Sequence, residues 1–170
     1  MGRNRGAFIR ETQTLSHLLH PPLLDELGFV AAARWYVEGF ASRSGIQVRL
    51  DLLSESERLP AVVEVVLFRI LQESLTNIHR HSGSSLADVH LRIDEGEVSL
   101  LVRDYGHGMP PEVLERFQKV GGQGGIGLSG MRERVNELNG VMEIRSDSQG
   151  TLVRVTVPIP SKTKQQAYDE

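Results

Sequence analysis

Three short segments of the sequence contain side chains that could bind a charged ligand. The first includes Glu73, Asn77 and Arg80, spaced four and then three residues apart. On a helix, side chains at this spacing lie on one face, about one turn from each other. A carboxylate, an amide oxygen and a guanidinium on one stripe suit a Mg²⁺ ion and a polyphosphate. The same residues also fit an ordinary solvent-exposed polar face, so this segment alone does not identify a site.

The second segment reads Asp104-Tyr105-Gly106-His107-Gly108 and directly follows a predicted strand. An ionised carboxylate only accepts hydrogen bonds, so Asp104 could pair with an exocyclic amine. The two glycines would let the backbone bend close to a planar ring. A turn that closes a hairpin would have the same pattern, so the segment is ambiguous when taken alone.

The third segment runs from Gly125 to Arg132 and fits the pattern G-x-G-x-x-G before a predicted helix. Backbone N–H groups at a helix start can hold phosphates. A Rossmann dinucleotide site would need a strand directly before the glycines and a βαβ unit around them. Here a glycine-rich loop precedes them and a predicted hairpin follows, which excludes that site. A Walker A loop is also excluded, because no G-K-[ST] follows the glycines.

The residue types exclude several other kinds of site. The chain has no cysteine, so disulfides, thiolate catalysis and cysteine metal sites are ruled out. Ser129 lacks the G-x-S-x-G elbow of a hydrolase nucleophile. The histidines show no metal-ligand spacing such as H-E-x-x-H; they are His17, His20, His79, His81, His90 and His107.

Hydrophobic periodicity predicts the elements that position these segments. Pro21-Pro22 separates the first two helices, Gly45 follows the end of the second, and Asn139-Gly140 follows the end of the last. Antiparallel strand pairs separated by helices imply an α+β fold. We expect a two-layer α/β sandwich with one mixed, mainly antiparallel sheet and helices on one face. The predicted helices cover 1–20, 23–42, 60–81, 110–120 and 131–138, and the predicted strands cover 46–53, 87–93, 98–102, 141–146 and 151–158.

The bulk composition bounds the partners and the location. The chain has 170 residues, a net charge of -3 and a pI of about 6.1, so nothing draws it to nucleic acid or to an anionic membrane. No apolar run approaches the roughly 18 residues of a membrane helix, and the N-terminus has no signal-peptide core. We expect a soluble, cytoplasmic domain.

In this order and at these spacings, the three segments resemble the N, G1 and G2 boxes of the GHKL superfamily, whose ATP-binding domain has the Bergerat fold. The sequence is most similar to sensor histidine kinases, in the branch that pairs with response regulators bearing a helix-turn-helix. The likeness runs from about residue 15 to residue 160. The stretches that carry it are Leu19–Gly28, Gln72–Asn77, Gly127–Val135 and Gly150-Thr151.

The resemblance implies a role for each box. Asn77 would ligate Mg²⁺, with Glu73 beside it as the polar or basic group. Asp104 would accept a hydrogen bond from the adenine amino group. Residues 109–124 would be the ATP lid. The other implied contacts are Arg80 and His81 in the N box, Gly106 and Gly108 shaping the pocket, Thr151 supporting it from the last hairpin, and the backbone of Gly125, Gly127, Leu128, Gly130 and Met131 around the phosphates.

The implied function is that of the ATP-binding catalytic domain of a two-component histidine kinase, with ATP and Mg²⁺ as cofactors. It would transfer the γ-phosphoryl group to a histidine on a dimerisation helix. Residues 1–22 would end that helix and its linker, residues 23–160 would form the catalytic domain, and residues 161–170 a polar tail. The parent protein would be a homodimer that can be membrane-attached, with a response regulator as partner. This chain alone would be a monomer or weak dimer.

The sequence departs from the family pattern in two ways. Arg80 stands where a phosphate-contacting lysine is common, and a planar fork is not equivalent to a point charge. The phospho-acceptor box is missing, so we expect no autophosphorylation in cis. The alternative is a GHKL nucleotide-binding module or ATPase switch without kinase activity. An anti-sigma-factor kinase is disfavoured by the stretch Leu19–Gly28.

Overall fold

The computed structural model describes residues 22–54, 57–119 and 126–159. The helix predicted over 1–20, the tail over 161–170 and Gly125 lie outside these ranges. The helices are α2 (Pro22–Leu27), α3 (Phe29–Ser44), α4 (Ala61–Asn77), the π-helical turn η1 (Ile78–Ser82), α5 (Pro111–Gln118) and α6 (Ile126–Glu137). The strands are β1 (Gln47–Asp51), β2 (Leu86–Asp94), β3 (Glu97–Asp104), β4 (Val141–Asp147) and β5 (Gly150–Pro158).

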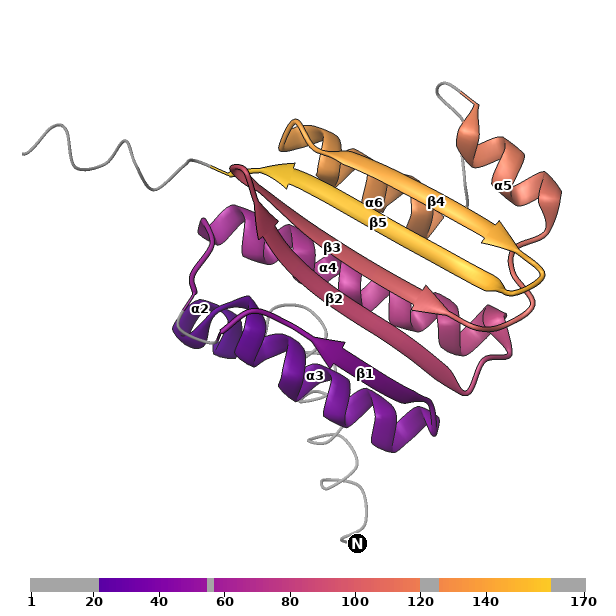
Figure 1. The fold of residues 1–170 in the computed structure, drawn as a ribbon, viewed down its shortest axis with the longest axis horizontal. Helices are drawn as coiled ribbons and strands as arrows, with labels where there is room; N and C mark the ends of the chain where they lie inside the picture. The colour runs from indigo at the N-terminus through magenta and orange to yellow at the C-terminus, as the bar shows by residue number, and fades with distance from the viewer. Residues whose placement is uncertain (1–21, 55–56, 120–125, 160–170) are drawn as a thin grey trace, which may run out of the picture.

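The five strands form one mixed sheet in the order β1-β2-β3-β5-β4. Only β1 and β2 are parallel; the other neighbours are antiparallel. Figure 1 shows α4 and α6 behind the sheet, with α3 alongside α4 near the edge strand β1. This arrangement confirms the predicted two-layer α/β sandwich with a mainly antiparallel sheet.

The core lies between the sheet and the helices. On β3, Val98, Leu100 and Val102 are buried while the residues between them are not, as expected for a strand with one covered face. On the helix side, α4 presents a stripe that includes the fully buried Leu67 and Leu71. Replacing such a leucine with alanine typically costs about 2–5 kcal/mol of unfolding free energy. Burial of these side chains therefore stabilises the packing of α4 against the sheet.

The helix predicted over 60–81 is α4 together with η1. The chain leaves regular α-helix after Asn77 and makes one π-helical turn, which ends at Gly83 with φ +68°. Such wide turns often occur at functional sites because they redirect side chains. Here the turn carries Arg80 and His81.

Two helix predictions need correction. The helix expected over 23–42 is divided into α2 and α3 by Gly28, whose φ is +85°. A Cβ at Gly28 would lie 2.7 Å from Nε of Arg58 and 2.9 Å from Oε1 of Glu64. Glu64 is a buried carboxylate that accepts hydrogen bonds from Arg58 and from the Leu59 N–H. The break therefore coincides with a positive φ that favours glycine, and this ion pair packs against it; local periodicity reveals neither feature.

The second correction concerns the last helix, expected over 131–138. Helix α6 begins five residues earlier, at Ile126, so the glycines of the third segment from Gly127 onward are helical. Glycine has a low helix propensity, so the sequence did not predict that this first turn is helical.

In the part of the chain that the structure describes, no helix combines the length and the apolar character needed to cross a bilayer.

Candidate functional site

A cavity of about 570 Å³ lies between α4, the end of β3, the start of α5 and the first turn of α6. This volume is in the range of small-molecule sites. It brings together most of the residues singled out in the sequence: Glu73, Asn77, Arg80, His81, Asp104, Gly108, Gly127, Leu128 and Thr151. Gly106, Gly130 and Met131 are not in its lining, and Gly125 lies outside the described residues.

One wall of the cavity carries polar side chains that have no partner among the described residues. Glu73 and Asn77 come from the last turn of α4, and Arg80 and His81 from η1. Within the described ranges, none of these four side chains forms a hydrogen bond or an ion pair with another residue. Polar groups on a cavity wall without internal partners are available to a ligand.

Helix α6 approaches this wall very closely. A Cβ at Gly127 would lie 1.9 Å from Oε1 of Glu73, so a larger residue here would displace the Glu73 carboxylate from its observed position. The N–H groups in the first turn of a helix have no intrahelical partner and attract anions. In α6 this turn includes Gly127 and Leu128, which line the cavity. The Leu128 and Met131 side chains are buried, and Met131 accepts a weak hydrogen bond from Ser74.

Asp104 lines the cavity from the end of β3. Strand alternation turns it inward after Val102, and it is only 4% exposed. Its Oδ1 accepts hydrogen bonds from the Gly106 N–H (2.9 Å) and the Thr151 N–H (3.3 Å). No described residue donates a hydrogen bond to Oδ2. Every fully buried side-chain oxygen among the described residues has a hydrogen-bond partner, so Oδ2 is not fully buried. Oδ2 is therefore accessible from the cavity as a fixed, unpaired acceptor.

The loop after Asp104 is held on two sides. The His107 N–H donates to the Ser82 carbonyl (3.0 Å), and the Met109 N–H donates to Oγ of Ser146 (2.7 Å). A Cβ at Gly106 would lie 1.9 Å from the Ser82 carbonyl oxygen, and one at Gly108 2.1 Å from that of Asp147. Both glycines therefore shape the loop, although only Gly108 lines the cavity.

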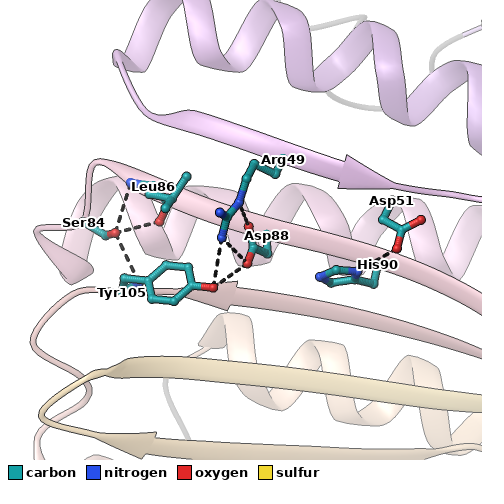
Figure 2. A network of polar contacts seen from close by, with 7 residues as sticks. All are labelled: Arg49, Asp51, Ser84, Leu86, Asp88, His90 and Tyr105. Atoms are coloured by element: carbon teal, nitrogen blue, oxygen red, sulfur yellow. Dashed lines mark hydrogen bonds and ion pairs between the residues drawn. The ribbon is translucent and has the colours of Figure 1, made fainter.

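Tyr105 fastens the same loop to the other face of the sheet (Figure 2). Its N–H donates to Oγ of Ser84, and its hydroxyl donates to Asp88 (2.5 Å). Arg49 on β1 forms two hydrogen bonds with Asp88, at 2.5 and 2.7 Å. The Arg49 hydrogen bond lowers the pKa of Asp88, and the bond to Asp88 raises the pKa of Tyr105. This network ties β1, β2 and the end of β3 together beside Asp104.

Comparison with known proteins identifies the family. A family model described as histidine kinase-, DNA gyrase B-, and HSP90-like ATPase matches residues 62–161. The chain belongs to this ATPase family. The matched range contains Glu73, Asn77, Asp104 and the glycines of α6, so all residues that line the cavity lie within the range that the family model matches.

Relatives of this ATPase domain include sensor kinases. The sensor histidine kinase MctS of Rhizobium johnstonii is 34% identical over 150 residues, which are 88% of this chain and 32% of MctS. The signal transduction histidine-protein kinase/phosphatase DegS of Brevibacillus brevis is 32% identical over 157 residues, which are 91% of this chain and 38% of DegS. The chain thus spans about a third of the length of these relatives.

The fold is also that of solved kinase domains. The histidine kinase domain of the blue-light activated histidine kinase from Erythrobacter litoralis matches with a TM-score of 0.69 at 18% identity. The match covers 88% of this chain and 73% of that chain. This likeness shows the Bergerat fold of histidine kinase catalytic domains, which the sequence predicted.

The sequence indicated some of the residues at this site and missed others. Asp104, Glu73 and Asn77 stand out by type and spacing, and all three line the cavity. Sequence reasoning missed Ser82, Ser146 and His107, of which Ser82 and His107 line the cavity. No local signal marks Ser146, because its partner Met109 lies 37 residues away.

The described residues of the ATPase domain contain no cluster of three His, Cys, Asp or Glu side chains suited to a metal ion. The amide oxygen of Asn77 and the carboxylate of Glu73 belong to residues that line the α4 wall of the cavity. They fit a hard cation such as Mg²⁺, which commonly takes one or two protein oxygens and completes its shell with phosphates and water.

Proposed function

We propose that this domain binds ATP with Mg²⁺ in the cavity and transfers the γ-phosphoryl group to a histidine on a dimerisation helix. It would then be the catalytic domain of a two-component sensor histidine kinase. The observation that carries the proposal is the unpaired Oδ2 of Asp104, which faces a cavity whose far wall holds free polar groups and a helix N-terminus. The names of the similar kinases support the same function.

Asp104 would recognise the base. Its Oδ1 is occupied by two backbone N–H groups, so the carboxylate cannot rotate freely. Oδ2 therefore presents an acceptor in a fixed direction, which suits the exocyclic amino group of adenine. A guanine ring would present a carbonyl oxygen at the equivalent position, and two acceptors repel. Fixed polar groups of this kind give a site its specificity.

The phosphates would lie between η1 and the first turn of α6. Arg80 supplies a guanidinium for charge-assisted hydrogen bonds, and the N-terminal N–H groups of α6 supply neutral donors. Asn77 would hold Mg²⁺, which neutralises phosphate charge when it is bound, and Glu73 would lie beside it as the polar or basic group. His81 lines the same wall and would contact the phosphates or their water shell.

Phosphoryl transfer requires positioning and charge neutralisation more than covalent help from the protein. In the proposed reaction the bond from the γ-phosphorus to the β–γ bridging oxygen breaks, and a bond from a histidine ring nitrogen to the phosphorus forms. ADP leaves with the electron pair of the broken bond. Glu73, free on the cavity wall, is the group placed to orient the incoming imidazole. A response regulator would later receive the phosphoryl group.

The first prediction tests the base contact. Replacing Asp104 with Asn keeps a carbonyl oxygen for the two backbone donors but puts an NH₂ donor where Oδ2 was. Binding of a non-hydrolysable ATP analogue, measured by calorimetry, should weaken by about 1.5–3 kcal/mol, or roughly 10- to 150-fold. Asp94→Asn, at an exposed position on β2, is the control and should bind like the wild type. Unchanged affinity of the Asp104 variant would refute the assignment of the adenine pocket.

The second prediction tests the metal. Asn77→Ala should remove the part of the affinity that depends on Mg²⁺ and leave metal-free binding almost unchanged. The same titrations with and without Mg²⁺ measure both quantities. An equal loss under both conditions would show that Asn77 contacts the nucleotide rather than the metal.

Kinase activity is tested separately from binding. The wild-type chain, Mg²⁺ and labelled ATP are mixed with a supplied dimerisation helix carrying its histidine, and with the same helix carrying Gln instead. Acid-labile label on the histidine form alone supports the kinase. Binding without transfer would favour a nucleotide-binding module or ATPase switch.

A further inference from the structure

Helix α5 forms part of the cavity wall although it lies at the edge of the molecule. Val113 on α5, together with Met109 and Pro110 just before it, lines the cavity. Figure 1 shows α5 at one end of the molecule, away from the layer formed by α3 and α4. One face of the helix packs on the core through half-buried Val113 and Leu114 and through Phe117, which is only 2% exposed. The position of α5 therefore depends on few contacts.

Arg132 of α6 makes two contacts with the last turn of α5. Its guanidinium carbon lies 3.5 Å from the centroid of the Phe117 ring, and its Nη2 donates a hydrogen bond to the Phe117 carbonyl oxygen. Carbonyl groups in the last turn of a helix lack intrahelical partners and carry partial negative charge. A cation here satisfies the carbonyl, stacks on the ring and complements the helix dipole at the same time.

The neighbouring arginines do not share this role. Arg134, two residues further along α6, is exposed and donates to the Gly130 carbonyl of its own helix. Arg116 on α5 is also exposed. In the described part of the chain, Arg132 is the cation that connects α6 to α5.

We propose that Arg132 is a positioning residue that holds α5 as a wall of the cavity and so slows the release of bound nucleotide. The proposal rests on the proposed function, because it assumes that the cavity holds a nucleotide. Arg132 itself is not in the cavity lining and acts through Phe117, whose helix carries Val113. Losing the contact would free the last turn of α5 and loosen that wall, while the phosphate and adenine contacts stay intact.

Both contacts with Phe117 require the guanidinium of arginine rather than another cationic group. A planar guanidinium can stack on the Phe117 ring while one N–H reaches the carbonyl, whereas a lysine ammonium cannot make both contacts in the same way. Arg132→Lys therefore keeps the charge and most of the volume but removes the stacked arrangement. Arg132→Gln removes the charge as well. Arg134→Gln makes the same chemical change on the same helix, away from α5.

The experiment measures the dissociation rate of a fluorescent ADP analogue by displacement with excess unlabelled ADP. Arg132→Gln should release the analogue about tenfold faster than the wild type, a ratio equivalent to about 1.4 kcal/mol. Arg132→Lys should also be faster, and Arg134→Gln should match the wild type. The association rate should change little, because the adenine and phosphate contacts are untouched. Release from both Arg132 variants at the rate of Arg134→Gln would overturn the proposal.

Amide hydrogen exchange over α5 separates this inference from the proposed function. Without nucleotide, Arg132→Gln should exchange faster over Pro111–Gln118 than Arg134→Gln does, while α4 stays protected in both. If the wild type bound no nucleotide, the proposed function would fail, whereas faster exchange in α5 would still support the anchoring role. Equal exchange in the two variants would overturn that role whatever the result for nucleotide.

Discussion

At the residue scale, the hydroxyl of Ser146 links two parts of the cavity that come from distant segments. Its oxygen accepts the Met109 N–H at 2.7 Å and shares a hydrogen bond of 2.9 Å with Oγ1 of Thr151. The Thr151 N–H in turn donates to Asp104. Ser146 thus joins the start of the loop toward α5 to the strand that supports the carboxylate, without lining the cavity itself.

Ser146→Ala removes this link and leaves the Met109 N–H without its acceptor. Loss of one such hydrogen bond typically costs about 1 kcal/mol. We expect a decrease of that size in the unfolding free energy and a several-fold weaker binding of the ATP analogue, measured by denaturant titration and calorimetry. Ser148→Ala changes an exposed serine of the same turn and should affect neither. Identical binding by the two variants would show that Ser146 does not support the site.

At the scale of elements, local patterns predicted the strands and the long helix well. The alternation of Val98, Leu100 and Val102 marks β3, and the turn before it closes the β2–β3 hairpin with Gly96 at φ +83°. The apolar stripe of α4 is equally plain in the sequence. These features depend on side chains a few residues apart, so the sequence alone is enough to find them.

The elements that were predicted less well are set by contacts between distant residues. Gly28, whose φ is +85°, divides α2 from α3 at the place where the Arg58–Glu64 pair lies against the chain. Gly127 lies within α6, where it packs against the Glu73 side chain. Contacts between distant residues also explain which site residues the sequence revealed. Asp104 and Asn77 are conspicuous by residue type, whereas Arg132 donates a hydrogen bond to a carbonyl oxygen 15 residues away. Tertiary structure decides such positions, and propensity does not.

At the scale of the whole molecule, a carboxyl group on the outer face of the sheet makes the free energy of unfolding depend on pH. Asp88 accepts two hydrogen bonds from Arg49 on the parallel edge strand β1 and one from Tyr105 on the far side of β2 (Figure 2). The Arg49 hydrogen bond, with a smaller contribution from Tyr105, holds the pKa of Asp88 below its ordinary value although burial opposes this. Arg49 is itself largely exposed, so the pair is screened by solvent and salt.

A carboxyl group whose pKa is lower in the folded state stabilises that state above its unfolded pKa, near 3.9, and loses this contribution as pH falls through the folded value. Asp88→Asn should therefore lower the unfolding free energy at neutral pH and flatten its dependence on pH below about 4. Denaturant titrations at several pH values measure both effects.

Asp94→Asn is the control, because Asp94 lies on the same strand and pairs with no cation in the described residues. A steep acid dependence retained in Asp88→Asn, equal to that of Asp94→Asn, would mean that other carboxyl groups control acid unfolding. Binding of the ATP analogue should change less than stability, because Asp104 keeps its own two backbone donors when the outer network is broken.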